Sequence, residues 1–137
     1  MKYRFMKKIL LTAIAILMMS SCQESLEERA AREAREITES KCPMPVGDVL
    51  FLDSIVFDIP SLTQTQYFRF IDIADNDSTV EQMKHNDLKK ILTDELKNTP
   101  NYKSLMQRGV SFRYIYRSTQ EPSKIYLDIT LNKEDYQ

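Results

Sequence analysis

The chain of 137 residues has few of the residue types from which catalytic and ligand sites are usually built. It contains two glycines, Gly47 and Gly109, which are too few for a glycine-rich loop that cradles phosphate. Its single histidine, His85, lies on the predicted outer side of a helix, and no Cys and His residues have metal-ligand spacing. The sequence therefore predicts neither a metal nor a cofactor, and it favours a protein without catalytic activity.

The first 22 residues have the order of a bacterial export signal. Four basic residues precede an apolar stretch at 9–19, and two serines stand before Cys22. The stretch is too short for a permanent membrane span. Residues 19–22 resemble a lipobox, the cleavage motif of lipoprotein signals. The resemblance implies that residues 1–21 are removed and that Cys22 becomes the acylated, membrane-anchoring first residue. The alternatives are an ordinary secretory signal followed by a thiol, or an uncleaved anchor.

The charge balance shifts once the signal is removed. Four of the 19 basic residues and no acidic residue lie in 1–21, which leaves 15 basic against 20 acidic residues and a net charge of −5. This balance argues against nucleic acid or anionic lipid as the main partner. Cys42 would then be the only free thiol, so no disulfide can form within the chain. Cys42 either packs as a small, half-buried residue or links two copies into a dimer.

Residues 22–41 predict a helical spacer between the lipid and the domain. Glu, Arg and Ala dominate the segment, and oppositely charged residues recur four apart. Because its apolar residues are few and small, the helix has little to bury. The alternative is that a narrow stripe formed by Leu26, Ala30, Ala34 and Ile37 docks on the domain or on a partner helix.

Residues 42–137 predict a single domain, which begins where two prolines and Gly47 end the spacer. Apolar residues at 48–59 and alternation at 67–73 predict two strands. Ser78 and Glu81 have capping-box spacing, which predicts the start of a helix that continues to Lys97. A short second helix opens at a proline and ends at Gly109.

The last segment predicts a hairpin of strands 110–117 and 124–131. A register with Tyr114 opposite Leu127 also places Arg113 opposite Asp128, so apolar and charged pairs agree. The resulting fold class is α+β, with a four-stranded antiparallel sheet in the order ββααββ packed on helix 78–97.

Aromatic and arginine side chains gather on the predicted sheet, and such residues favour protein or glycan recognition. Tyr114 and Tyr116 are expected in the core under the helix. The predicted exposed binding face consists of Arg69, Arg113, Arg117 and Tyr126.

Two further patterns remain open. Asp53 interrupts an apolar strand, and a cleft between Asp53, Arg69 and Arg113 would indicate a small envelope enzyme or an enzyme inhibitor. The triplet that contains Ser78 resembles the O-glycosylation acceptor of Bacteroides-type bacteria, as does the triplet at Ser54. Because Ser54 lies inside a predicted strand, modification is expected at Ser78 and not at Ser54.

The layout resembles the small lipoproteins of unknown function found in Bacteroides-type bacteria. The resemblance rests on the acidic residues after Cys22, on the patterns at 42–43 and 52–54, and on the closing segment 109–114. It implies a lipid-anchored protein of the outer membrane, because Gln23 replaces the Asp associated with inner-membrane retention. Whether the protein faces the periplasm or the outside stays open. The expected function is a tethered accessory module that contacts another envelope protein through a sheet face or strand edge.

Overall fold

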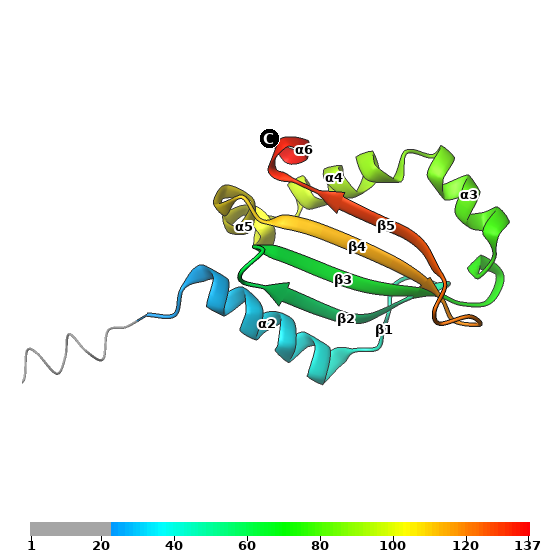
Figure 1. The fold of residues 1–137 in the computed structure, drawn as a ribbon, viewed down its shortest axis with the longest axis horizontal. Coiled ribbons are helices and arrows are strands. Elements are labelled where there is room, and N and C mark those ends of the chain that lie inside the picture. Colours follow the sequence, from blue (N-terminus) through cyan, green and yellow to red (C-terminus); the bar gives the residue numbers. More distant parts are fainter. Residues whose placement is uncertain (1–22) are drawn as a thin grey trace, which may run out of the picture.

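A computed structural model of the protein describes residues 23–137, so Cys22 and the predicted signal lie outside the described residues. Figure 1 shows a single sheet with helices along its two long sides. The elements in chain order are α2 (Leu26–Lys41), β1 (Met44–Pro45), β2 (Leu50–Asp58), β3 (Thr63–Phe70), η1 (Asp72–Ala74), α3 (Asp77–His85), α4 (Leu88–Asn98), η2 (Pro100–Tyr102), α5 (Lys103–Arg108), β4 (Ser111–Ser118), β5 (Ile125–Leu131) and α6 (Lys133–Tyr136).

The α+β class is confirmed, but the sheet is mixed and not purely antiparallel. It has five strands in the order β1-β2-β3-β4-β5, and β3 and β4 run parallel. The helices between these two strands carry the chain back to the end where β3 begins, so β4 must repeat the direction of β3. The additional strand β1 is two residues long and pairs with Phe51 and Leu52 at the edge of β2. The expected four-stranded antiparallel sheet was therefore wrong in this detail.

The single helix expected over 78–97 is two helices, α3 and α4. Asp87 adopts a left-handed backbone conformation and caps α4, with its side chain accepting a hydrogen bond from the backbone N–H of Lys90. This conformation cannot continue a right-handed helix. The start of α3 also differs, because Asn76 and not Ser78 is the capping residue and accepts a hydrogen bond from the N–H of Thr79.

The hairpin of β4 and β5 exists, with a register two residues away from the expected one. Tyr114 pairs with Ile129 and not with Leu127. A shift of two residues keeps every side chain on its predicted face, because side chains alternate along a strand. The Arg113 and Asp128 side chains still form a bidentate ion pair, with N–O distances of 2.8 and 2.6 Å, across a diagonal of the ladder.

The register changes at an irregularity between Tyr116 and Arg117, and the loop that follows β4 is held by the buried Asp75. Its carboxylate accepts hydrogen bonds from the backbone N–H groups of Thr119 and Gln120 and from the hydroxyl of Tyr126, at 3.0, 2.9 and 2.8 Å. Burial opposes ionisation of Asp75, but these bonds and one from Ser118 outweigh it and hold the pKa of Asp75 below its ordinary value. Asp75 thus ties the turn between β4 and β5 to η1.

All the helices that contribute to the core cover one face of the sheet. The strand register places Leu52, Phe68, Tyr116 and Leu127 in one row across this face, and all four are buried. The rings of Phe68 and Tyr116 stack at 5.0 Å. Leu92 and Leu96 of α4 are also buried in this core. We call the other face of the sheet the open face, because none of these helices packs against it.

Helix α2 is docked on the sheet, which corrects the expectation of a free spacer. Ala34 is buried in the core, and the Thr38 hydroxyl accepts a hydrogen bond from the N–H of Ile55 at 2.9 Å. The hydroxyl hydrogen itself is shared between the carbonyl oxygens of Ala34 and Ile55, at O–O distances of 2.9 and 3.0 Å. Thr38 therefore satisfies the free edge of β2 where the short strand β1 does not reach. The docking alternative, with small alanines that allow close approach, describes the structure.

Candidate functional site

A groove of about 480 Å³ separates α2 from η2 and α5, with the helix-covered face of β2 and β3 as its floor. We call it the α2–α5 groove. Its volume lies in the range of ordinary small-ligand pockets. The apolar side chains that line it come from both walls and the floor, and they are Leu26, Ala30, Ala34, Ile37, Ile55, Tyr102 and Leu105.

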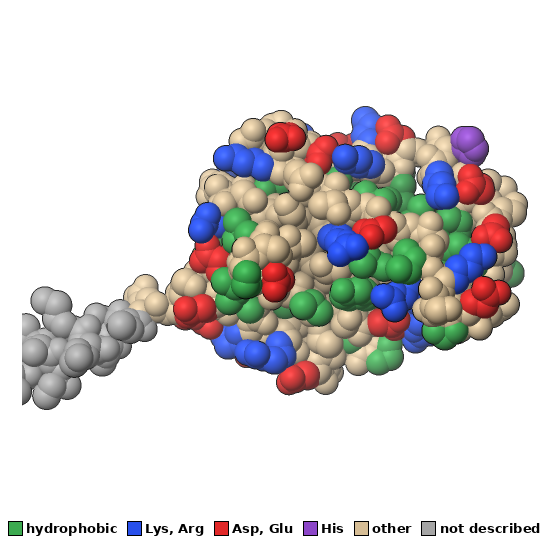
Figure 2. All heavy atoms as spheres, viewed as in Figure 1, with side chains coloured by type: hydrophobic (Ala, Val, Ile, Leu, Met, Phe, Trp, Pro, Cys, Tyr) green, Lys and Arg blue, Asp and Glu red, His purple; other side chains and the backbone are tan. Residues whose placement is uncertain are grey.

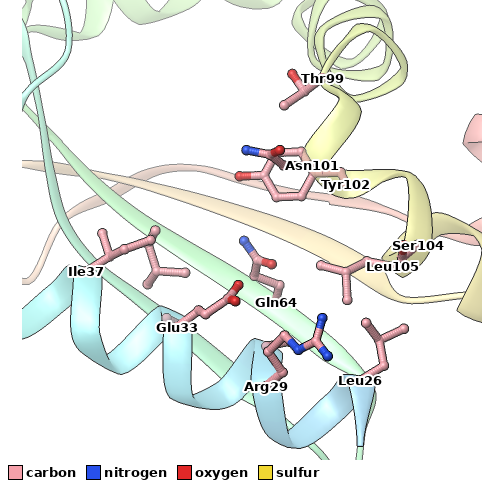
Figure 3. A pocket seen from close by; sticks show the side chains of 13 residues that line it. Leu26, Arg29, Glu33, Ile37, Gln64, Thr99, Asn101, Tyr102, Ser104 and Leu105 are labelled. Atoms are coloured by element: carbon pink, nitrogen blue, oxygen red, sulfur yellow. The ribbon is translucent and has the colours of Figure 1, made fainter.

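Polar groups also point into the groove. Gln64 rises from the floor, while Arg29 and Glu33 extend from α2 on one wall (Figure 3). Neither Arg29 nor Glu33 forms an ion pair with another residue of the described part of the chain. Asn101 and Ser104 contribute neutral polar groups on the opposite wall. The groove thus combines apolar walls with unpaired charges of both signs.

The two ends of the groove differ. At the start of α2, an ion pair between Glu27 and Arg108 bridges the two walls. Farther along, Thr99 and Tyr102 also line a second, mostly apolar cavity of about 390 Å³ beneath α4. The groove and this cavity therefore share Thr99 and Tyr102 in their linings.

Three of the four residues predicted as a binding face share the open face. Arg69 and Arg117 are opposite one another on the parallel strands β3 and β4, and Arg113 lies four residues before Arg117. Each has a partner within the protein: Arg69 pairs with Asp53 at 2.7 Å, Arg113 pairs with Asp128, and Arg117 lies 5.6 Å from the ring centre of Tyr67.

Tyr126 does not join them. It sits at the irregularity in the β4–β5 ladder and packs edge-on against Phe70, where its hydroxyl binds Asp75. Tyr114 and Tyr116 are buried, as expected, and burial raises the pKa of Tyr116 to about 12. Neither hydroxyl is prepared to act as a base at neutral pH.

The surface visible in Figure 2 carries interspersed basic, acidic and hydrophobic side chains, with no continuous area of one charge. Asp128 accepts hydrogen bonds from Arg113, which lower the pKa of its carboxyl group despite partial burial. An open depression on the open face is lined by Arg113 but by neither Asp53 nor Arg69. The three residues of the predicted enzyme cleft therefore do not converge.

The model of the family described as "Domain of unknown function (DUF8479)" matches residues 25–127. The chain belongs to the DUF8479 family. The match includes α2 together with most of the sheet, in agreement with the docked position of that helix. No curated protein matches this DUF8479 domain significantly.

Solved structures share its fold. The pilotin EpsS of the Vibrio vulnificus type 2 secretion system has a TM-score of 0.60 at 13% identity, over 82% of this chain and 92% of that one. The type II secretion system pilotin AspS of Vibrio cholerae has a TM-score of 0.56 at 18% identity, over 85% and 97%. A candidate secreted protein of Pseudomonas aeruginosa has a TM-score of 0.61 at 12% identity, over 84% and 100%. These identities establish a common fold and nothing finer.

The other residues that the sequence singled out, Cys42 and His85, do not form a cluster with other candidate site residues among those that the structure describes. Cys42 is free and half-buried, and burial followed by the nearby charge of Asp53 raises the pKa of its thiol. A raised pKa disfavours the thiolate that disulfide exchange needs. A dimer through Cys42 remains a prediction. His85 is exposed, and residues 23–137 contain no group of three or more potential metal ligands. Nor is any helix in this range long and apolar enough to cross a membrane.

Ser78 is exposed in the first turn of α3 and has no role as the helix cap. Its hydroxyl is therefore accessible, and O-glycosylation at Ser78 remains a prediction. Ser54 lies within β2 and pairs in register with Tyr67 of the open face.

The groove itself was not predicted from the sequence. Its central residue, Gln64, precedes the stretch 67–73 that predicted the second strand, because the segment Thr63–Gln66 is wholly polar. One signal was available: Gln64 and Gln66 continue the alternation of Phe68 and Phe70 toward the N-terminus. That pattern would have extended the strand and placed two amides on an apolar face.

Proposed function

We propose that this protein is a lipid-anchored accessory protein of the bacterial outer membrane that binds a segment of another envelope protein in the α2–α5 groove. The observation that carries the proposal is the groove, which is open between α2 and α5 and lined by apolar side chains with a few polar groups. Such a lining is typical of sites that bind a peptide segment.

The position of the anchor supports this proposal. Cys22, which would carry the lipid, precedes Leu26 of the docked helix α2 by four residues. Four residues span at most about 14 Å. A lipid on Cys22 would thus hold the groove close to the membrane, where a segment of a membrane-associated partner is accessible. Gln23 in place of Asp favours the outer membrane as the location.

The similar structures add support of a general kind. Two of them are named as pilotins of type II secretion systems, so the fold occurs in accessory components of envelope machinery. Because the identities are low, the partner of this chain is a proposal made from its own groove and not from those proteins.

The alternative, a small envelope enzyme or enzyme inhibitor, has less support. Asp53 is paired with Arg69, whereas Arg113 is paired with Asp128. A catalytic acid or base needs access to a substrate in a prepared pocket. Since these carboxylates and arginines neutralise one another on an open sheet face, the geometry favours a non-catalytic binding role.

Crosslinking in intact cells of the producing bacterium tests the proposal. Captured partners and the protein's own N-terminus are both identified by mass spectrometry. We expect an acylated Cys22 and one recurrent envelope protein. An unmodified N-terminus would contradict the lipid anchor, and an acylated protein that captures no recurrent protein would contradict the accessory role.

A further inference from the structure

Gln64 is the polar exception in an otherwise apolar row of the sheet. The strand register aligns it with Phe57 on β2, Phe112 on β4 and Leu131 on β5, and all three of these side chains are buried. Gln64 itself is only 7% exposed. An amide in such a row is costly unless it is hydrogen-bonded.

The Gln64 side chain forms no hydrogen bond with any other described residue, whereas Gln66 on the same face reaches the hydroxyl of Tyr102 at 3.4 Å. Residues 23–137 contain no fully buried side-chain nitrogen or oxygen without a partner. The polar atoms of the Gln64 amide are therefore not fully buried. Figure 3 shows the amide pointing into the α2–α5 groove between the walls. Its hydrogen-bonding capacity is available to whatever occupies the groove.

We propose that Gln64 determines the specificity of the α2–α5 groove by hydrogen-bonding a backbone amide of a bound peptide segment. This inference rests on the proposed function and specifies its partner. A primary amide offers both donors and an acceptor, which match the N–H and C=O groups of a peptide unit. The apolar walls formed by Leu26, Ile37 and Leu105 then receive apolar side chains that flank the bonded peptide unit.

The lining argues against other occupants. An acyl chain would cover the Gln64 amide without offering it a partner, which costs free energy. A phosphorylated ligand would need more positive charge than Arg29 provides, because Glu33 of the same wall offsets it. A peptide segment can satisfy the amide and both charges at once.

The test replaces Gln64 with methionine, which has a similar length and no amide. Gln82→Met, at an exposed position of α3, is the matched control. The probe is N-methylacetamide, a molecule with one peptide bond and two methyl groups. Its binding is monitored by the NMR signals of the protein's backbone amides and glutamine side-chain amides. We expect saturable shifts at Gln64 and Leu105 in the unchanged protein. The affinity falls about tenfold in Gln64→Met, as the loss of one hydrogen bond implies, and stays unchanged in Gln82→Met.

Thermal unfolding of the same variants completes the test. If the amide serves binding, Gln64→Met does not lower Tm. A lower Tm would mean that Gln64 stabilises the fold, which would overturn the proposal. The proposal would also be overturned if Gln64→Met bound N-methylacetamide with the same affinity as the unchanged protein. The same conclusion would follow if dodecanoate, and not N-methylacetamide, produced saturable NMR chemical-shift changes in the groove. If cells yield a recurrent partner whose capture Gln64→Met leaves unchanged, the proposed function stands and the role of Gln64 is refuted.

Discussion

Replacing Thr38 by valine removes the hydroxyl group that joins α2 to the free edge of β2. Valine has nearly the same shape and a similar helix propensity, so packing and helix formation are little affected. The N–H and the carbonyl oxygen of Ile55, which now lie 2.9 and 3.0 Å from the hydroxyl, lose this partner. Because α2 covers this edge, water can replace the hydroxyl only in part.

The expected magnitude follows from these two backbone groups. An unsatisfied buried group costs about 1–3 kcal/mol, and the partial burial of this site places each group at the low end. Thr38→Val should therefore lower the free energy of unfolding by about 2 kcal/mol. For a domain of this size, that loss corresponds to a decrease in Tm of about 8 °C.

A matched control isolates the contact with the strand. Thr93 of α4 donates its hydroxyl hydrogen bond to the carbonyl of Lys89 in its own helix, at 2.8 Å, and to no strand. Thr93→Val should change the free energy of unfolding by less than about 0.5 kcal/mol. Urea unfolding followed by circular dichroism measures both variants. Equal effects of the two substitutions would refute the argument that Thr38 fastens α2 to the sheet.

Three other predictions concern charge and backbone conformation. The pKa values of Asp75 and Asp128 are lowered in the folded state, so both carboxylates stabilise the fold above their unfolded pKa of about 3.9, and this stabilisation is lost as pH falls through their folded pKa values. Urea unfolding should therefore show a free energy of unfolding that decreases below about pH 4. The decrease should be less steep in Asp75→Asn. Gly109 ends α5 at φ +86°, with only the side chain of Lys133 nearby, at 3.6 Å from an added Cβ. Gly109→Ala should lower the free energy of unfolding by about 1 kcal/mol, because alanine is strained in the left-handed conformation. Urea unfolding measures this loss, and an unchanged free energy of unfolding would contradict the left-handed conformation at this position. A double-mutant cycle on Arg113 and Asp128 should give a coupling of about 0.5–1 kcal/mol, small because water screens this exposed pair, and salt should reduce it.

Local patterns predicted most of the elements correctly. Strand β4 follows from the alternation predicted over 110–117, one residue from its observed bounds, and the end of α5 follows from the glycine at 109. The same alternation assigned Arg113 and Arg117 to the open face, because only a slip by an odd number of residues could have moved them.

The relations between distant segments could not be predicted in this way. The docking of α2 depends on one threonine hydroxyl and on small alanines, which give almost no hydrophobic signal. The parallel pairing of β3 with β4 depends on the helices between them, which carry the chain back to the end where β3 begins, and no local pattern shows this return. The polar segment Thr63–Gln66 also hid the start of β3. Since both walls and the floor of the groove come from these segments, the groove became visible only in three dimensions.

Binding of partners in the α2–α5 groove can be tested by site-specific photo-crosslinking in living cells. Benzoylphenylalanine is placed either at Ser104, an exposed residue of the groove wall, or at Val56, an exposed residue of the open face. We expect the photo-reactive residue at Ser104 to capture one recurrent envelope protein through a defined peptide, and the one at Val56 to capture none. Capture from Val56 alone would assign binding to the open face and contradict binding in the groove.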